Sequence, residues 1–292
     1  MSLVRVHNFS VSLDGFSAGA DQSQEAPFGQ AGDRLVRWFT GTRSFHVMTG
    51  QDGGNTGIDD AFASSWGPGI GAEIIGRNKF GPQRGPWTDE EWKGYWGEEP
   101  PFRTPVFVLT HHLRPPVEMK GGTTFHFTDA SPAQALAAAR QAAGGLDVRI
   151  GGGPATVRQF LAAGLIDHMH VALVPILLGR GESLWDGLEG LEERFAIESV
   201  SSPSGVTHIT FTRRQPRLGL PPRTGARSRA GRAQDLRRKS KATPVRRSPA
   251  PDASALALWP RPSQPEIIGC SFCPHLVETT PDIFSLPRIR RA

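Results

Sequence analysis

The stretch that decides the fold runs from Asp147 to Asp167 and has the sequence DVRIGGGPATVRQFLAAGLID. Before the glycines, Val148 and Ile150 alternate with polar residues, which predicts a short strand with one buried face. After the glycines, apolar residues recur at helical spacing on one face, namely Val157, Phe160, Leu161 and Leu165. Pro154 suits the first helical position, where its missing N–H loses no hydrogen bond. The stretch therefore predicts a strand, a glycine turn and an amphipathic helix.

The glycine turn, Gly151–Gly153, predicts an anion site. A helix that starts after residues without side chains exposes backbone N–H groups, and these donors together with the helix dipole favour a phosphate or pyrophosphate. The alternative is a tight turn without a ligand, as in any α/β protein. Two better-known phosphate motifs are excluded, because G-x-G-x-x-G would need glycine in place of Thr156 and G-x-x-x-x-G-K-[ST] does not occur.

Charge and composition divide the chain near residue 215. Residues 216–292 contain 15 basic and 5 acidic residues, whereas residues 1–215 contain 18 basic and 23 acidic residues. The C-terminal part is also rich in proline and lacks sustained apolar periodicity, which is typical of a segment without a packed core. We expect one α/β domain over residues 1–215 and a disordered basic tail over residues 216–292.

Cysteine usage and hydropathy indicate the compartment. Cys270 and Cys273 both lie in the tail; with His275 they could begin a zinc site, but a second ligand pair is missing. His168 and His170 share one face of a predicted strand, but they have no third ligand in the sequence, so we interpret them as polar strand positions and expect no metal. The chain shows no signal-peptide pattern and no apolar run of membrane-spanning length, so we expect a cytoplasmic protein that does not enter a membrane.

Strands and helices are predicted to alternate along the domain. Expected strands are Leu3–Ser12, Glu73–Ile75, Val106–Leu109, Thr123–Phe127, Asp147–Ile150 and Met169–Val174, and expected helices are Asp33–Thr40, Ile58–Trp66 and Pro132–Ala143, besides the one after Gly153. Thr88–Glu91 has a capping-box pattern that predicts a turn of helix. Phe195–Val200 and Val206–Thr212 predict a terminal hairpin. This order predicts an α/β fold with a mixed, mostly parallel sheet, covered by helices and ending in an antiparallel pair.

Six short motifs occur in an order that is similar to one superfamily. They are Ser12-Leu13-Asp14-Gly15, Ile75-Gly76-Arg77, Val108-Leu109-Thr110, Ile150-Gly151-Gly152-Gly153, Gly164-Leu165-Ile166-Asp167 and the run from Val174 to Gly181. Together they resemble the reductase domain at the C-terminus of bifunctional riboflavin deaminase-reductases, which has the dihydrofolate reductase fold, a three-layer sandwich. The resemblance covers roughly residues 3–214 and none of the tail.

The resemblance implies that NADPH binds across the carboxyl edge of the sheet. The cofactor-binding residues it implies are Gly76, Arg77, Thr110, His111, Gly151, Gly152, Gly153, Ala155 and Thr156. The glycine loop and helix start would receive the pyrophosphate, which agrees with the anion site predicted from the residues themselves. Arg77 would lie near the adenosine phosphates, and Thr110 and His111 would hold the ribose and its 2′-phosphate. Basic residues around that pocket would favour NADP over NAD, although Lys79 and Arg114 are better interpreted as solvated surface.

Two acids compete for the substrate side, where hydride delivery to a C=N bond also needs a proton. Asp14 follows the first strand, which in the family passes close to nicotinamide and substrate; its alternative is a turn-forming Asp-Gly. Asp33 lies in a stretch that resembles the dihydrofolate reductase helix whose acid contacts the pterin. Its alternative is a favourable charge at a helix N-terminus.

The chain also departs from the family. Riboflavin reductases usually carry a glutamate that contacts the ribosylaminopyrimidine where this chain has Gly151, which argues against that substrate. The zinc deaminase signature is absent, so we expect no deaminase activity. The stretch from Gly85 to Pro101 exceeds the minimal fold, and its aromatic residues, Trp87, Trp92, Tyr95 and Trp96, could wall a planar substrate or cover a sheet edge.

The leading hypothesis is an NADPH-dependent reductase that passes hydride to a small heterocyclic substrate, pterin-like, aminopyrimidine-like or related. One alternative is a non-catalytic NADP-binding module, because a fold does not guarantee an activity. Another is binding of nucleic acid or an acidic partner through the basic clusters Arg227–Arg232 and Arg237–Lys241, although a tail without function explains them better. The resemblance further implies a homodimer, with Met169–Val174 and Pro175–Leu178 near its interface.

Overall fold

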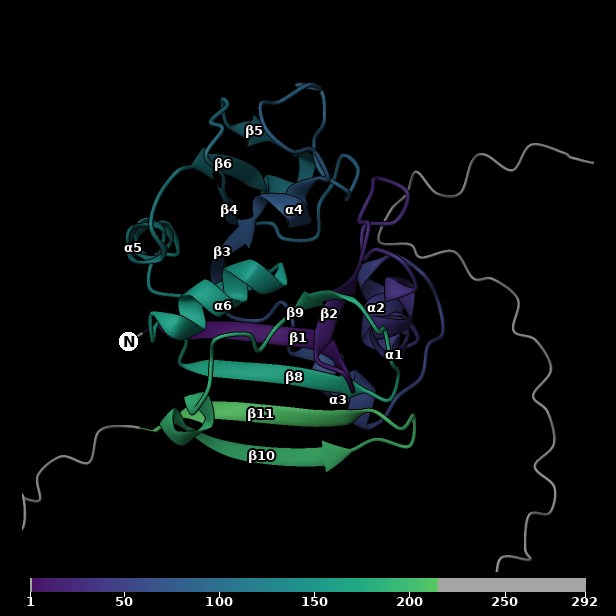
Figure 1. The fold of residues 1–292 in the computed structure, drawn as a ribbon. Helices are drawn as coiled ribbons and strands as arrows, with labels where there is room; N and C mark the ends of the chain where they lie inside the picture. Colours follow the sequence, from purple (N-terminus) through teal and green to yellow (C-terminus); the bar gives the residue numbers. More distant parts are fainter. Residues whose placement is uncertain (1, 215–292) are drawn as a thin grey trace, which may run out of the picture. The chain divides into compact units, whose positions relative to one another are not determined.

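A nine-stranded sheet organises the protein in the computed structural model, which describes residues 2–214. Six parallel strands form its centre: β1 (Val4–Ser12), β3 (Ile70–Gly76), β4 (Pro105–Leu109), β6 (Thr124–Thr128), β7 (Asp147–Gly152) and β8 (His168–Val174). Three strands run antiparallel to a neighbour: β5 (Val117–Glu118), β10 (Phe195–Ser201) and β11 (Thr207–Arg213). The strand order is β10-β11-β8-β1-β7-β3-β4-β6-β5 (Figure 1). The predicted mixed, mostly parallel sheet with a C-terminal hairpin is therefore confirmed.

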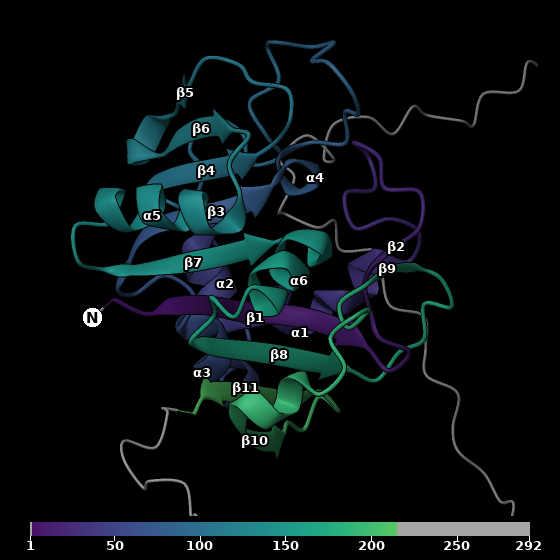
Figure 2. The same cartoon turned by 60° about the vertical axis from the view of Figure 1, so that its left-hand side comes forward.

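Helices cover both faces of the sheet. The helices α5 (Pro132–Ala142) and α6 (Pro154–Ala162) lie on one face, and α1 (Arg37–Thr40), α2 (Arg43–Met48) and α3 (Ile58–Ser64) lie on the other (Figures 1 and 2). On the first face, Val157 and Phe160 of α6 are fully buried against β1 and β7. On the second, Trp38 and Phe39 pack with Ala172 of β8. The result is a helix–sheet–helix sandwich of three layers.

Local sequence signals explain how the two long helices begin. Ser131 and Gln134 form a reciprocal capping box at the start of α5. Gly153 is the N-cap of α6 and Pro154 follows it at the first turn, as the sequence predicts. The preceding strand, β7, extends to Gly152, so two of the three glycines belong to the strand end.

A tryptophan-rich segment, residues 81–104, covers β3, β4 and β6 on the face opposite α5. It follows the short helix α4 (Arg77–Phe80), and it contains no helix or strand of its own. Trp96 stacks on Phe125 with ring centroids 5.9 Å apart, and Trp92 donates from Nε1 to the backbone oxygen of Phe80 at 2.9 Å. These aromatics pack on a face of the sheet and not over its edge, and Tyr95 and Trp96 also line the cavity described below.

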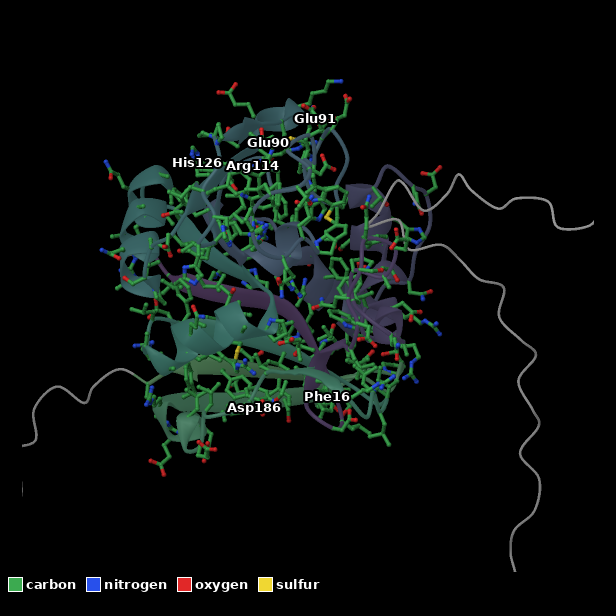
Figure 3. The ribbon with its side chains drawn as sticks, turned by 45° about the horizontal axis from the view of Figure 1, so that its top comes forward. Phe16, Glu90, Glu91, Arg114, His126 and Asp186 are labelled. Atoms are coloured by element: carbon green, nitrogen blue, oxygen red, sulfur yellow. The ribbon has the colours of Figure 1, made fainter. Side chains whose placement is uncertain are left out.

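The turn of helix predicted at Thr88–Glu91 is wrong. The Asp89 side chain accepts hydrogen bonds from the backbone N–H groups of Glu91 (3.0 Å) and Trp92 (3.2 Å), so an aspartate turn replaces the threonine cap. Arg114, predicted to be solvated surface, ties this turn to the sheet by donating to the backbone oxygens of Trp92 (3.1 Å) and Glu90. Figure 3 shows Glu90, Glu91 and Arg114 at this edge of the molecule.

Short elements escape the sequence pattern. The strands β2 (Phe16–Gly19) and β9 (Gly181–Ser183) pair in a separate two-stranded sheet. The helix predicted at Asp33–Thr40 is divided into a 3-10 turn, η1 (Gly32–Leu35), and α1. Further 3-10 turns are η2 (Lys120–Gly122) and η3 (Leu191–Arg194). Within residues 2–214, no helix is long and apolar enough to cross a bilayer.

The strand expected near a dimer interface is an interior strand. β8 lies between β1 and β11, and Met169, Val171 and Val174 are buried within the chain. Leu177, beyond the strand, is 65% exposed. The homodimer stays a prediction, and β8 itself offers it no free apolar face. The predicted tail, with its basic clusters and its Cys270–His275 motif, lies outside the described residues.

Candidate functional site

A cavity of about 590 Å³ opens where β3, β4, β6 and β7 end. Gly76, Leu109, Thr128 and Gly152, which lie at or next to the carboxyl ends of these four strands, all line it. Open α/β sheets bind ligands at this edge because the connecting loops and helix N-termini converge there. The strand order therefore brings residues that are far apart in the sequence to one wall.

One part of the cavity wall is a cradle formed by Gly152, Gly153 and the first turn of α6. No side chain caps the helix at Gly153, so its first N–H groups are available to a ligand. A Cβ at Gly153 would meet nothing within 4 Å among the described residues, which means that the loop faces open space. A Cβ at Gly76 would lie 2.3 Å from Oγ1 of Thr156, so glycine there permits β3 to approach the helix start. Backbone donors thus face the cavity without obstruction.

Arg77, at the start of α4, lines the cavity beside the cradle. Its guanidinium stacks 3.9 Å from the centroid of the Trp87 ring and donates to the backbone oxygen of Gly85. Its Nε and Nη2 atoms are buried and have no hydrogen-bond partner among residues 2–214. Burial, and then the neighbouring Arg84, lower the pKa of Arg77. Because unpaired buried donors are costly, an anion at this point would stabilise the arrangement.

Thr110 and His111 follow β4. Oγ1 of Thr110 accepts a hydrogen bond from the backbone N–H of His112 at 3.1 Å, which shapes the turn after the strand. The His111 side chain is 89% exposed and lies 2.6 Å from a carboxylate oxygen of Asp129. Asp129 also lines the cavity, so an acid accompanies the histidine that is predicted to hold the 2′-phosphate.

All nine predicted cofactor residues line this one cavity. Their convergence is a finding of the structure, and their role in binding NADPH stays a prediction.

The two predicted catalytic acids do not line the cavity. Asp14 accepts hydrogen bonds from the backbone N–H groups of Leu178 (3.1 Å) and Gly179 (2.6 Å). Desolvation opposes its charged form, but the hydrogen bond from Ser12 and those from the backbone outweigh it and lower the pKa of Asp14. The carboxylate thus fixes one loop against another, which corresponds to the alternative of a structural Asp-Gly turn.

Asp33 is similarly removed from the cavity. Its side chain is 55% exposed and pairs with Arg37 at 2.7 Å, one helical turn later. The geometry agrees with its alternative, an electrostatic role at the start of a helical segment. Neither acid lines this cavity, and the catalytic role of Asp14 or Asp33 stays a prediction.

Beside the cradle lies an ion cluster that the sequence analysis missed, formed by Glu73, Lys79 and Arg149, of which Lys79 and Arg149 line the cavity. Glu73 on β3 is fully buried and Arg149 beside it on β7 is 2% exposed. Arg149 donates to Oε2 of Glu73 from Nε at 3.0 Å and also from Nη2. The ammonium of Lys79 lies 3.4 Å from Oε1 of Glu73 and donates to the backbone oxygen of Gly151 at 2.7 Å.

Gly151 makes room for this cluster. A Cβ at this position would come within 1.8 Å of Oε1 of Glu73 and 2.9 Å of the Lys79 ammonium. The carboxylate from the neighbouring strand therefore occupies the volume that a side chain at position 151 would take. The sequence does contain one signal of the cluster, because Glu73 and Arg149 are charged residues within otherwise apolar strands.

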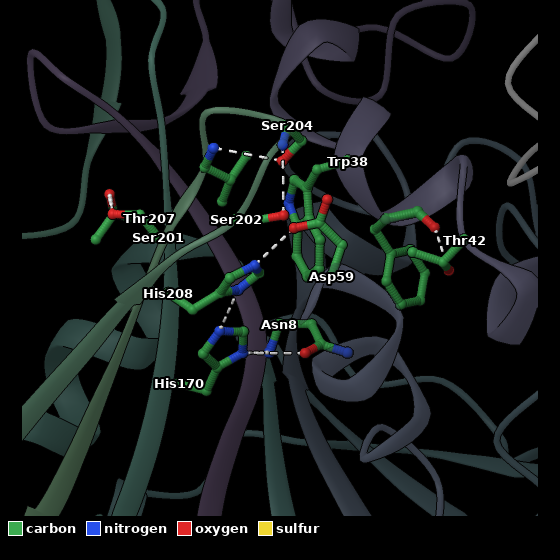
Figure 4. Close-up of polar contacts among 12 residues, drawn as sticks. Asn8, Trp38, Thr42, Asp59, His170, Ser201, Ser202, Ser204, Thr207 and His208 are labelled. Carbon is green, nitrogen blue, oxygen red and sulfur yellow. Dashed lines mark hydrogen bonds and ion pairs between the residues drawn. The ribbon is translucent and has the colours of Figure 1, made fainter. Parts of the chain in front are cut away.

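A chain of polar groups connects Asn8 of β1, His170 of β8, His208 of β11 and Asp59 of α3 (Figure 4). Nδ1 of His170 lies 3.2 Å from the backbone nitrogen of Asn8, and Nε2 of His170 lies 3.0 Å from Nδ1 of His208. Nε2 of His208 in turn lies 2.7 Å from Oδ1 of Asp59. His170 is thus a hydrogen-bonded strand position, as predicted, and the chain ends at Asn8, which lines the cavity.

Two histidines of this region are held neutral. Burial, then the charges of Arg5 and Arg149, lower the pKa of His7 to about 3. Burial, then the neighbouring His208, lower the pKa of His170 to about 3 as well. His7 lines the cavity, so its neutral ring adds no positive charge to the wall near neutral pH.

Comparison with known proteins identifies the family. The family model of the RibD C-terminal domain matches residues 5–208. A provisionally named riboflavin biosynthesis protein from Shewanella sp. PV-4 has 20% identity and a TM-score of 0.44, with 74% of this chain and 100% of that chain covered. The deaminase/reductase from Thermotoga maritima, diaminohydroxyphosphoribosylaminopyrimidine deaminase/5-amino-6-(5-phosphoribosylamino)uracil reductase, has 13% identity and a TM-score of 0.41, with 73% and 56% covered.

A dihydrofolate reductase from Enterococcus faecalis, complexed with NADP(H), has 13% identity and a TM-score of 0.36, with 73% of this chain and 97% of that chain covered. No curated protein matches the sequence. The match over residues 5–208 spans well over half of the sequence and includes most of the sheet and all residues that line the cavity. The chain therefore belongs to the RibD C-terminal domain family.

Proposed function

We propose that this protein is an NADPH-dependent reductase that transfers hydride to a small heterocyclic or related substrate. The observation that carries the proposal is the cradle, in which the uncapped start of α6 and the Arg77 side chain line one cavity. Membership of a family of reductase domains supports the same class of reaction. Bound NADPH would supply the hydride, and the chain supplies position and charge.

The residues present fit a dinucleotide phosphate. The helix start and the open face of Gly153 accommodate a pyrophosphate, which needs backbone donors and no intruding side chain. Arg77, with Arg84 near it, supplies the positive charge that a 2′-phosphate would need. His111 contributes less than the sequence suggests, because Asp129 pairs with it. We therefore assign the preference for NADPH over NADH chiefly to Arg77.

Ligand-induced thermal stabilisation of the full chain tests this proposal. NADPH should raise the melting temperature, and Arg77→Met should weaken NADPH binding by about tenfold or more while changing NADH binding less, since it removes charge-assisted hydrogen bonds. Arg37→Met is the matched control, because Arg37 is exposed and pairs with Asp33 away from the cavity. Absence of any stabilisation at saturating NADPH would overturn the proposal.

A non-catalytic NADP-binding module is the second candidate, and it shares the cradle with the first. Oxidation of NADPH in the presence of pterin or aminopyrimidine substrates separates the two, because a binding module would show stabilisation without turnover. The homodimer and binding through the basic tail stay predictions, and neither is needed for the reaction proposed.

A further inference from the structure

We propose that the ion cluster formed by Glu73, Lys79 and Arg149 is the substrate-recognition site, and that it selects a planar substrate bearing an anionic group such as a carboxylate. The proposal rests on the proposed function in that it deepens the same cavity: the cradle takes the cofactor and the cluster takes the substrate. The anion would bind Lys79 directly and feel the field of Arg149.

The ion cluster has more basic groups than acidic ones. Within residues 2–214, the ion pairs of Lys79 and of Arg149 both go to Glu73, so two basic groups share one carboxylate; burial lowers the pKa of Lys79, and Glu73 opposes that shift. His7, which also lies at this wall, is neutral near pH 7, and Arg5 is paired with Asp147 at 3.2 Å. A net positive charge in a buried wall is unfavourable until an anion joins it.

The Lys79 ammonium has one hydrogen-bond donor left for a ligand. An ammonium has three donors. One is used at 2.7 Å by the backbone oxygen of Gly151, and a second points to Glu73 at the longer distance of 3.4 Å. The side chain is 28% exposed and lines the cavity, so a third donor remains for a ligand. Arg149, by contrast, is buried and directed to Glu73 and the backbone oxygen of Trp66, so it contributes charge and holds Glu73 in place.

Aromatic side chains around the cluster define the shape of the ligand. The guanidinium of Arg149 lies 3.7 Å from the centroid of the Trp66 ring, and the Lys79 ammonium lies 5.8 Å from that of Phe102. Phe102 in turn packs edge-on against Trp96, with centroids 4.7 Å apart. Trp66, Trp96 and Phe102 all line the cavity. Flat aromatic walls beside a cation suit a planar molecule with a negative group at its edge.

Benzoate and benzamide are the probes for this site, because they share a planar shape and differ in charge. Binding of each to the full chain is measured by calorimetry, both without cofactor and with saturating NADPH. We expect benzoate to bind about tenfold or more tightly than benzamide, as a charge-assisted hydrogen bond predicts. Lys79→Met should abolish this difference, and Lys79→Arg should preserve most of it.

Glu73→Gln provides a test of opposite sign. It removes the negative charge of the cluster while keeping its volume, so benzoate should bind several-fold more tightly and benzamide should be unaffected. Circular dichroism confirms that each variant is folded. Should Glu73→Gln fail to fold, Lys79→Met still decides the proposal, since Lys79 is partly exposed and its replacement leaves Glu73 paired with Arg149.

Three outcomes would overturn the proposal. Equal binding of the two probes excludes selection for an anion, as does a Lys79→Met variant that binds benzoate normally. A loss of NADPH affinity in Lys79→Met without any effect on benzoate would assign Lys79 to a cofactor phosphate instead. Because the probes are also measured without cofactor, a failure of NADPH to bind would count against the proposed function and leave the benzoate result to decide this site.

Discussion

The cradle and the ion cluster are built on different principles. The cradle uses backbone donors and small residues within one continuous stretch, Gly152–Thr156, at the start of one helix. The ion cluster uses side chains from β3, α4 and β7, which only the strand register brings together. The residues of the cradle are consecutive in the sequence, whereas the residues of the ion cluster come together only once the sheet has formed. Variants that affect the ion cluster and spare the cradle, or the reverse, test this contrast.

The largest effect is expected from Glu73→Leu. It leaves Arg149 and Lys79 as uncompensated buried cations, so the free energy of unfolding should fall by about 3–5 kcal/mol. The double variant with Arg149→Leu should recover part of the loss, since it removes one of the unpaired charges. Urea denaturation measures both. Glu198→Leu, at an exposed position of β10, is the control and should change stability little. A loss below about 1 kcal/mol in Glu73→Leu would contradict the structural role of the cluster.

The second-largest effect is the loss of folding stability at low pH, and it arises from His7, whose pKa is lowered chiefly by burial and in part by Arg149 of the ion cluster. The pKa of His7 is about 3 in the folded state, and the unfolded value is near 6.5. The unfolded chain therefore takes up a proton as the pH falls below about 6.5 and the folded chain does not, so the stability that is fully present above that pH is lost toward pH 3. At about pH 4.5 the loss from this one residue should reach roughly 2–3 kcal/mol.

Urea denaturation of wild type and His7→Phe across this pH range measures the effect. The variant should lose less stability on acidification, because it has no proton to take up in the unfolded state. His170, with its pKa also about 3, should add a similar slope that remains in the variant. Parallel pH profiles for the two proteins would show that His7 is not held neutral.

A matched pair of glycine variants compares the ion cluster, which Gly151 adjoins, with the cradle, to which Gly153 belongs. Gly151→Ala should destabilise the fold by about 1–3 kcal/mol, because its Cβ would meet the carboxylate of Glu73. Gly153→Ala should leave stability nearly unchanged, because its Cβ would face open space, yet it should weaken NADPH binding. Thermal denaturation with and without NADPH measures both. Equal stability of the two variants would refute the close packing at position 151.

The smallest effects are expected at Asp14 and Asp33, the two acids that do not line the cavity. Asp33→Asn should cost no more than about 1 kcal/mol, as an exposed pair does. Asp14→Asn should cost somewhat more, since it weakens acceptors for two backbone N–H groups. Neither variant should change NADPH affinity in a calorimetric titration. A selective loss of NADPH turnover in either one, with binding intact, would restore the catalytic role predicted from the sequence.

This contrast also explains what the sequence could predict. The strand–glycine–helix unit at β7 and α6, the helix that begins at Pro132 and the β10–β11 hairpin follow from neighbouring residues, and the structure confirms them. The turn at Thr88 failed because Asp89, one residue later, competes for the same donors. The ion cluster was missed because Glu73 opposes Arg149 only through the pairing of β3 with β7. Local pattern does not determine which strands become neighbours.

The absence of a side chain at Gly151 has a consequence for sequence variation at two positions. Positions 73 and 151 compete for one volume, so a long acid at 73 and any side chain at 151 exclude each other. In an alignment of relatives, we expect the two positions to covary: chains with a residue larger than glycine at 151 should have a small or apolar residue at 73. Exchanging one arrangement for the other then requires two coordinated substitutions.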